Sequence, residues 1–347
     1  MSPGQPARTR EKAGENVQTP RLPPEGGSQE CPSTPKTRPG AVLNLRTVFG
    51  FNYPERVTVL EAIQRSAEFL ARKGVDSPRL QAELLLAHAL KTPRMQLYLD
   101  FERALTPAEL EILRVLVKRR GQREPLQQIT GSAWFCGLEM AVNRHVLAPR
   151  PETELLAERG WQFLQELVRQ GRAGPESPPN ALEFGLGSGC VAVALAVHCP
   201  EAQVYGVEVS AEALEVARQN AARHGVSQRL HLQRGDGFAA LPAGLRAHVI
   251  VSNPPYIPSA ELGTLAPEVR DYEPRQALDG GPDGLVFYRR LAVEAPPFLG
   301  PGGRLMVEMG DGQAEALRDI FGTQNWVVET VQEDYTQAPR VLVARRN

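Results

Sequence analysis

The regular alternation of strand-like and helix-like segments after residue 180 limits the fold more than any other feature of this sequence. Residues 203–208 and 247–251 are short, largely apolar runs typical of buried strands, whereas residues 210–225 have the period of an amphipathic helix. Strands that are apolar on both sides need helices on both faces of their sheet. The alternation therefore predicts an α/β fold with a seven-stranded, mostly parallel sheet. Its last two strands have no helix between them and are expected to form an antiparallel hairpin at an edge.

A glycine-rich turn, Gly185, Gly187 and Gly189, separates the first strand from the helix that follows it. Glycine lets a ligand approach the backbone, and the start of a helix offers unpaired N–H groups. In open α/β sheets, ligands bind at this end of the strands. The dinucleotide pattern G-x-G-x-x-G would need a glycine where Cys190 stands. The G-x-G-x-G spacing favours S-adenosylmethionine instead.

Acidic residues end the next two strands. Glu208 ends the second strand, where a carboxylate can accept hydrogen bonds from both ribose hydroxyls. Dinucleotide sites use a carboxylate in the same way, so Glu208 alone does not identify the ligand. Asp236 ends the third strand and is placed to accept from an adenine amino group, with a plain turn aspartate as the alternative.

The fourth strand runs into Asn253-Pro254-Pro255-Tyr256, at the same end of the sheet as the glycine turn. The side-chain oxygen of Asn253 and the carbonyl of Pro254 are two acceptors that can grip both hydrogens of a planar –NH2 group. Pro255 stiffens the turn, and Tyr256 can stack on a flat amide or base. The stretch suits an amino nitrogen that attacks an electrophilic methyl group on a sulfonium. A purely structural turn is the alternative.

Charge and composition exclude several classes of protein. The chain carries 39 Lys and Arg against 40 Asp and Glu, which disfavours binding to nucleic acid through phosphate neutralisation. Its four scattered cysteines lack a CxxC pair, so we expect reduced thiols and no metal site. No apolar run of transmembrane length and no secretory signal are evident, so we expect no membrane contact.

The sequence before residue 151 divides into three parts. Residues 1–56 are rich in proline and poor in aliphatic residues at their start, and we predict a disordered tail. Residues 57–124 are predicted to form a helical domain, with capping boxes at Thr58 and Thr106 and with Ser77 as a further N-cap. Residues 125–150 change period and predict a β-hairpin linker, which leaves residues 151–347 for the α/β domain.

Over residues 57–347 the sequence resembles the release-factor glutamine methyltransferases, the PrmC/HemK family. The resemblance is carried by REPLQQITG, VLAPRPETELL, LEFGLGSGC, SNPPYIP and EPRQALDGGPDGLVFYRRL. It implies a Rossmann-like class I methyltransferase domain that transfers a methyl group from S-adenosylmethionine to the N5 amide of glutamine. The family's substrate is the Gly-Gly-Gln loop of peptide chain release factors, which the helical domain would recognise. We expect a monomer in the cytoplasm, with the mitochondrial matrix as the alternative.

The resemblance also assigns roles by position. The residues that would contact S-adenosylmethionine are Gly185, Leu186, Gly187, Ser188, Gly189, Glu208, Asp236, Gly237 and Asn253. The glutamine side chain would lie against Asn253, Pro254, Pro255 and Tyr256, of which Asn253, Pro254 and Tyr256 would be catalytic. Three positions depart from the family pattern: Glu183 and Glu208 stand where aspartate is common, and Gly237 where the side chain is often bulkier.

Three other functions fit parts of the pattern. An amino-directed methyltransferase acting on N6 of adenine or N2 of guanine in DNA or RNA would share the Asn-Pro-Pro-Tyr stretch, but it would have to flip a base into the pocket. A non-catalytic adaptor would bind S-adenosylmethionine without turnover. A nicotinamide dehydrogenase conflicts with Cys190 in the glycine turn.

Overall fold

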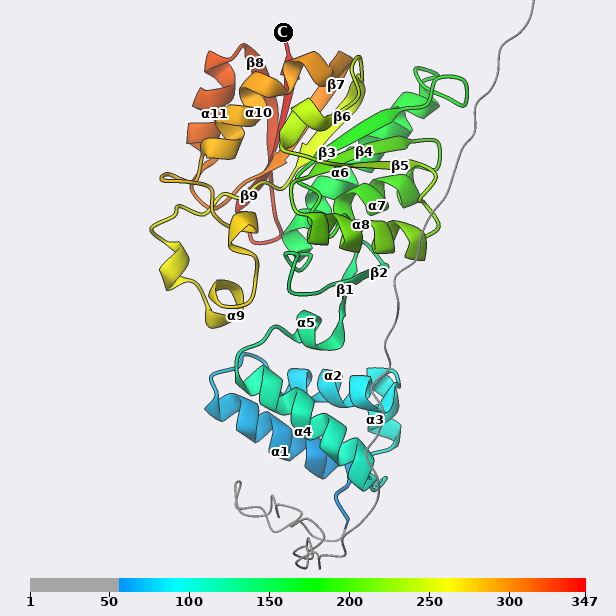
Figure 1. The fold of residues 1–347 in the computed structure, drawn as a ribbon, viewed down its shortest axis with the longest axis vertical. Coiled ribbons are helices and arrows are strands. Elements are labelled where there is room, and N and C mark those ends of the chain that lie inside the picture. Colours follow the sequence, from blue (N-terminus) through cyan, green and yellow to red (C-terminus); the bar gives the residue numbers. More distant parts are fainter. Residues whose placement is uncertain (1–55) are drawn as a thin grey trace, which may run out of the picture. The chain divides into compact units, whose positions relative to one another are not determined.

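The computed structural model describes residues 56–347, so the predicted tail over residues 1–56 lies outside the described residues except for its last position. The described chain begins with a group of helices, of which α1, α2 and α4 pack around one apolar core (Figure 1). The helices are α1 (Val59–Arg72), α2 (Pro78–Leu90), α3 (Arg94–Leu99), α4 (Pro107–Gly121) and α5 (Leu126–Thr130).

The three predicted helix starts are confirmed, and two of them have a side-chain cap. Thr58 and Thr106 each form a complete capping box with the glutamate three residues later. Ser77 is the N-cap residue of α2 as predicted, but its backbone has a φ of 47° and its side chain makes no capping hydrogen bond. Pro78 follows it at the first helical position and supplies the fixed φ that starts α2.

An antiparallel hairpin follows α5 and consists of β1 (Ser132–Phe135) and β2 (Leu138–Ala141). Its turn contains Cys136, with a φ of 49°, and Gly137, with a φ of 75°. Phe135 and Met140 are fully buried in the same core as the helices of the following domain. The hairpin is therefore packed structure, although its strands are short.

The main sheet has seven strands in the order β5-β4-β3-β6-β7-β9-β8, as the alternating pattern predicted. The strands are β3 (Asn180–Phe184), β4 (Gln203–Glu208), β5 (Leu230–Arg234), β6 (Ala247–Ser252), β7 (Leu299–Glu308), β8 (Trp326–Glu333) and β9 (Pro339–Arg346). The first five are parallel, and β9 pairs antiparallel with both β7 and β8. The expected edge hairpin is thus confirmed.

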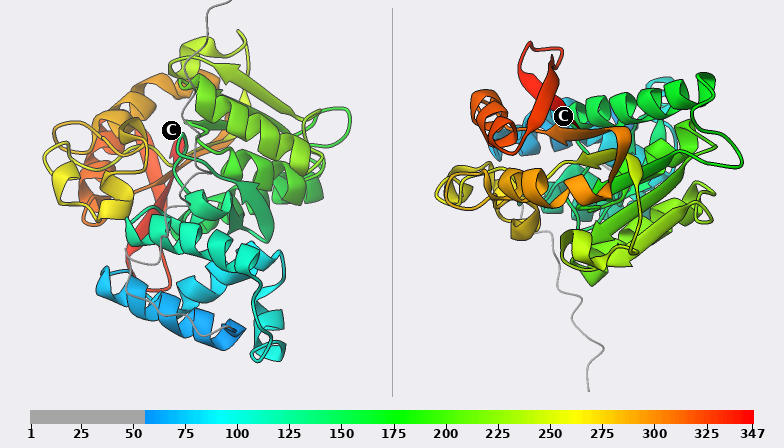
Figure 2. Two further views of the ribbon diagram at one scale, coloured as in Figure 1. Left: turned by 60° about the horizontal axis from the view of Figure 1, so that its bottom comes forward. Right: turned by 90° about the horizontal axis from the view of Figure 1, so that it is seen from above.

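Helices cover both faces of this sheet (Figures 1 and 2). One core lies under α6 (Pro151–Arg169), α7 (Cys190–His198) and α8 (Ala211–Arg223). The other lies under α10 (Val286–Glu294) and α11 (Ala314–Thr323). The remaining helical turns are α9 (Pro267–Arg270), η2 (Gly237–Ala240), η3 (Leu262–Thr264), η4 (Arg275–Ala277) and η5 (Pro296–Phe298).

The topology fixes where a ligand can bind. From β3 the chain moves to β4 and β5 on one side and then returns to β6 on the other side of β3. This reversal leaves a crevice at the carboxyl ends of β3 and β6, which is the usual ligand site of open α/β sheets. No helix in the described part of the chain is long and apolar enough to cross a membrane.

Candidate active site

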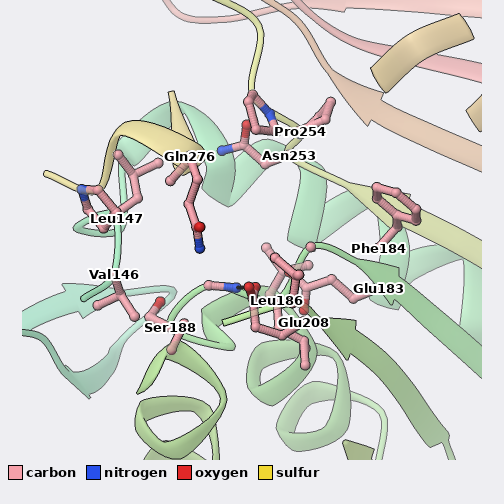
Figure 3. Close-up of a pocket in the computed structure, with 18 of the residues that line it drawn as sticks. Val146, Leu147, Glu183, Phe184, Leu186, Ser188, Glu208, Asn253, Pro254 and Gln276 are labelled. Carbon is pink, nitrogen blue, oxygen red and sulfur yellow. Dashed lines mark hydrogen bonds between the residues drawn. The ribbon is translucent and has the colours of Figure 1, made fainter. Parts of the chain in front are cut away.

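A cavity opens at the carboxyl ends of β3, β4 and β6. It brings together ten of the predicted site residues, which are Gly185, Leu186, Gly187, Ser188, Glu208, Asp236, Gly237, Asn253, Pro254 and Pro255. Gly189 and Tyr256 are not part of its lining. Figure 3 shows Asn253 and Pro254 on one side of the cavity and Ser188 and Glu208 on the other, with Gln276 reaching between them.

The first two glycines of the turn face the cavity, and the third does not. Gly185 and Gly187 have φ angles of 78° and 52°, and a Cβ at either position would point into open space with no neighbouring atom within 4 Å. Gly189 also has a positive φ, but its Cβ would lie 2.8 Å from the Cβ of Ala217 in α8. The turn thus leaves a backbone-lined cradle for a ligand, while Gly189 permits close packing of α7 on α8.

The carboxylate of Glu208 fastens the glycine turn. Its Oε2 accepts from the backbone N–H of Gly187 at 2.9 Å, and its Oε1 accepts from that of Ser210 at 2.9 Å. An ionised carboxylate offers about four lone-pair sites, so about two remain for incoming hydroxyl groups. The geometry is compatible with the ribose role that the sequence predicts for this residue.

A second carboxylate, that of Glu183, lies buried behind the turn. Only 2% of the residue is exposed, and its Oε2 accepts from the backbone N–H of Ala192 at 2.8 Å. Burial holds the pKa of Glu183 well above its usual range, and the nearby charge of Glu208 adds to this effect. A ligand with a positive group near this acid would offset the cost of ionising it.

The far end of the cavity contains a residue that sequence reasoning missed. Arg290 of α10 forms an ion pair with Asp236, which is 54 residues away in the chain. Its guanidinium carbon lies 5.4 Å from the centre of the Phe184 ring. A Cβ on Gly237 would clash with this guanidinium. Arg290 therefore fills the space that a bulkier side chain at position 237 would take, and only the fold brings it there.

The first three residues of the Asn-Pro-Pro-Tyr stretch line the cavity, and Tyr256 does not. Asn253 donates through Nδ2 to Oγ1 of Thr153, at 3.0 Å, and the two prolines line the cavity beside it. Tyr256 instead packs beside Gly310, where a Cβ would lie 2.9 Å from its ring. Burial raises the pKa of Tyr256 to about 12, so its phenol stays protonated at neutral pH. The stacking role of Tyr256 remains a prediction.

Two further segments line the cavity, residues 145–150 and, after β6, Pro274, Gln276 and Ala277. They are held together by Arg150, whose guanidinium donates to both carboxylate oxygens of Glu273 at 2.7 and 2.8 Å. The blocks VLAPRPETELL and EPRQALDGG carry these residues in the sequence. Both blocks contributed to the family resemblance, but their spacing alone gave no reason to place them at the ligand.

The segment before residue 274 is tied to the helices at the start of the described chain. The carboxylate of Glu268 accepts from Arg120 at 2.8 Å and from Arg123 at 2.7 Å. The hydroxyl of Tyr272 donates to the carbonyl of Gln122 at 2.8 Å. One continuous segment, residues 267–277, thus runs from contacts with α4 to the lining of the cavity.

Comparison with known proteins identifies the family. The PrmC N-terminal domain model matches residues 61–131, and the methyltransferase small domain model matches residues 162–266. A release factor glutamine methyltransferase of Geobacter sulfurreducens is 45% identical over 292 residues, which cover 84% of this chain and 98% of the relative. One from Chlorobaculum tepidum is also 45% identical, over 82% of this chain and 96% of the relative. This chain belongs to the release factor glutamine methyltransferase family.

The family inferred from the motifs is thereby confirmed. Family membership makes the protein an S-adenosylmethionine-dependent methyltransferase and favours the glutamine reaction over the nucleic-acid alternative. A more distant likeness is the crystal structure of a methyltransferase from Pyrococcus furiosus, which is 20% identical with a TM-score of 0.42, over 60% of this chain and 89% of that one.

Proposed function

We propose that this protein methylates the N5 amide of the glutamine in the Gly-Gly-Gln loop of peptide chain release factors. The observation that carries the proposal is that the glycine turn after β3 and Asn253 after β6 line one cavity. These two strands are direct neighbours in the sheet. A donor cradle and a clamp for a planar nitrogen therefore lie side by side, and the names of the relatives supply the substrate.

The donor would lie along the glycine turn. Gly185 and Gly187 offer it backbone that no side chain covers, and Glu208 retains acceptor sites for the ribose hydroxyls. When bound, S-adenosylmethionine supplies an electrophilic methyl group on a sulfonium. Gly189 would contribute indirectly, by letting α7 lie close to α8. The buried carboxylate of Glu183 is suited to the donor's ammonium group.

The adenine would lie against the guanidinium of Arg290, at the end of the cavity near Asp236. A guanidinium is planar and stacks on aromatic faces, so Arg290 can supply the flat surface that glycine at position 237 lacks. The carboxylate of Asp236 keeps free lone pairs beside its ion pair with Arg290 and is proposed to accept from the adenine amino group.

The glutamine amide would be gripped by the Asn253 side chain and the Pro254 carbonyl. Acceptors on both hydrogens of the –NH2 group orient its nitrogen toward the donor and stabilise the positive charge that develops on it. Correct alignment of the two reactants can contribute ~7–11 kcal/mol to the barrier reduction. Pro255 would keep the turn rigid, whereas the stacking of Tyr256 on the substrate stays a prediction, because Tyr256 does not line the cavity. The proton lost by the nitrogen can pass to water.

Recognition of the release factor is proposed for the helical domain, residues 57–124, with residues 125–150 as its link to the catalytic domain. The ties from Arg120 and Arg123 to Glu268 support this role, because they connect α4 to the segment that reaches the cavity. We propose that the protein acts as a monomer in the cytoplasm, with the mitochondrial matrix as the alternative compartment.

Mass spectrometry tests the proposed function directly. A purified release factor is incubated with the protein and S-adenosylmethionine, and its Gly-Gly-Gln tryptic peptide is expected to gain one methyl group. A release factor with alanine in place of that glutamine is the control and should stay unmodified. Methyl transfer to DNA or RNA but not to the release factor would overturn the proposal.

A further inference from the structure

A group of polar side chains lies behind the Asn-Pro-Pro turn. Asn253 Nδ2 donates to the hydroxyl of Thr153 in α6 at 3.0 Å. The same hydroxyl lies near the carboxylate of Glu308 at the end of β7 and lowers its pKa, against the larger effect of burial. Thr153 and Glu308 are only 3% and 2% exposed. The Oε2 atom of Glu308 has no hydrogen-bond partner among the described residues. The three side chains come from three elements of the fold and converge on the substrate side of the cavity.

The donors and acceptors on these side chains determine which way the Asn253 amide is oriented. When Glu308 is ionised its carboxylate can only accept, so a Thr153 hydroxyl that bonds to it donates its one hydrogen. Its lone pairs are then left for Asn253, which must present its –NH2 group to Thr153. The amide oxygen of Asn253 is consequently turned away from Thr153 and is available to the cavity.

The position of Glu308 is costly for stability. An unpartnered oxygen on a buried carboxylate carries a desolvation penalty that no direct ion pair relieves. Burial raises the pKa of Glu308 to about 7, the charge of Glu152 acts in the same direction, and Arg340 and Arg150 oppose it. The phenols of Tyr256 and Tyr288 lie close enough to feel its charge. Costs of this kind are concentrated at functional sites.

We propose that Thr153 and Glu308 are positioning residues that hold the Asn253 amide with its oxygen toward the substrate nitrogen. This inference rests on the proposed function, because it explains why the Asn253 side chain accepts a hydrogen bond from the substrate nitrogen rather than donating one to it. With the amide reversed, the Asn253 –NH2 group would face the –NH2 group of the glutamine. Two donors would then oppose each other, and the clamp would lose one of its two acceptors.

The first test compares two substitutions of one residue. Thr153→Val keeps the shape but removes the hydroxyl, and we expect kcat to fall ~10- to 100-fold because the reacting nitrogen is misplaced. Thr153→Ser restores the hydroxyl and should recover most of kcat. S-adenosylmethionine affinity should differ little between the two variants. The Tm of Thr153→Val is expected to be lower, because buried polar groups lose a partner, so kcat is compared at a temperature at which both variants are folded. A Thr153→Val enzyme with parental kcat would overturn the proposal.

The second test uses the pH dependence of Glu308→Gln, whose neutral amide can donate or accept and so imposes no direction. At pH 8 the parent should turn over ~10-fold or more faster than the variant. As the pH falls through about 7, Glu308 is protonated and the ratio of the two kcat values should approach one. A ratio that does not change with pH would contradict the proposed positioning of Asn253 by Thr153 and Glu308.

A third measurement is independent of turnover, so that failure of this positioning and failure of the proposed function can be told apart. The side-chain amide signal of Asn253 is assigned by NMR through its loss in Asn253→Ala. In the parent and in Thr153→Ser its protons should exchange slowly, and in Thr153→Val they should shift and exchange faster. If the parent does not methylate the release factor, the proposed function is wrong. If the Asn253 signal is unchanged in Thr153→Val, the positioning role of Thr153 is wrong.

Discussion

The Glu208 carboxylate accepts a hydrogen bond from the backbone N–H of Gly187, 2.9 Å away, and so joins the ends of β4 and β3. The acid and the glycine turn, recognised separately in the sequence, are one structural unit in the fold. A turn held in this way loses little conformational freedom when a ligand binds to it.

Replacement of Gly187 by Val should block donor binding. The φ of 52° is unfavourable for a β-branched residue, and the side chain would enter the cradle. We expect the affinity for S-adenosylmethionine to fall at least ~10-fold because the side chain takes the space of the donor, whereas the strained φ lowers stability by of order 1–3 kcal/mol. Calorimetry measures this, with Gly171→Val as a control that has a similar φ of 67° far from the cavity. Unchanged affinity in Gly187→Val would contradict the role of the turn.

Removal of the amide in Asn253→Ala should abolish methyl transfer and spare much of the donor affinity. The side chain supplies one of the two acceptors for the substrate nitrogen, whereas the donor has the glycine turn and Glu208 as well. Single-turnover kinetics and calorimetry separate the two effects. Parallel loss of transfer and donor binding would argue against this division of roles.

Loss of the charge in Glu268→Gln should impair recognition of the whole release factor more than chemistry. Both Arg120 and Arg123 bind this carboxylate, and they lie in or beside α4. We expect KM for the intact release factor to rise about 5-fold as the segment loosens, with KM for a short Gly-Gly-Gln peptide unchanged. Asp271→Asn removes a solvent-exposed pair with Arg270 nearby and serves as the control. An equal rise in both KM values would refute the coupling.

Arg290→Ala should weaken donor binding through loss of the flat surface over Gly237. A cation–π contact contributes ~1 kcal/mol, so the dissociation constant for S-adenosylmethionine should rise about 5-fold. Arg289→Ala is a matched control, because Arg289 pairs with Asp283 and does not line the cavity. If both variants bind the donor equally well, Arg290 has no part in the adenine site.

The buried acid Glu308 predicts an unusual pH dependence of stability. Its pKa rises from 4.5 to about 7 on folding, so the folded protein binds the proton more tightly and its stability falls as pH rises from 4.5 to 7. Glu308→Gln has no such loss and should be more stable than the parent by ~3 kcal/mol at pH 8. Urea denaturation at pH 5 and pH 8 checks this. A difference that does not grow with pH would refute the prediction.

Much of the fold could be predicted because its signals are local. Alternating apolar runs indicated seven strands, and Thr58 and Thr106 marked helix starts through contacts within one turn. Ser77 has the right residue type for a cap, yet its backbone adopts a left-handed conformation in which the side chain makes no capping bond. Residue type alone does not report backbone conformation.

The candidate site was only partly predictable, because several of its contacts join residues that are far apart in the sequence. Residues next to the glycine turn and the Asn-Pro-Pro stretch could be placed by their position at strand ends. The pairs Arg290–Asp236 and Asn253–Thr153 join residues 54 and 100 positions apart, and no sequence spacing announces them. Tyr256 belongs to the motif, but packing beside Gly310 takes it out of the cavity lining.

The buried Glu308 carboxylate at the end of β7 lowers the stability of the fold, and in our proposal it also supports turnover. A laboratory selection that rewards survival after heating should favour neutral side chains of similar volume at position 308, such as Gln, because they remove the penalty of a charge without a partner. The surviving clones should be robust proteins that work slowly. Selection on growth rate should return the glutamate.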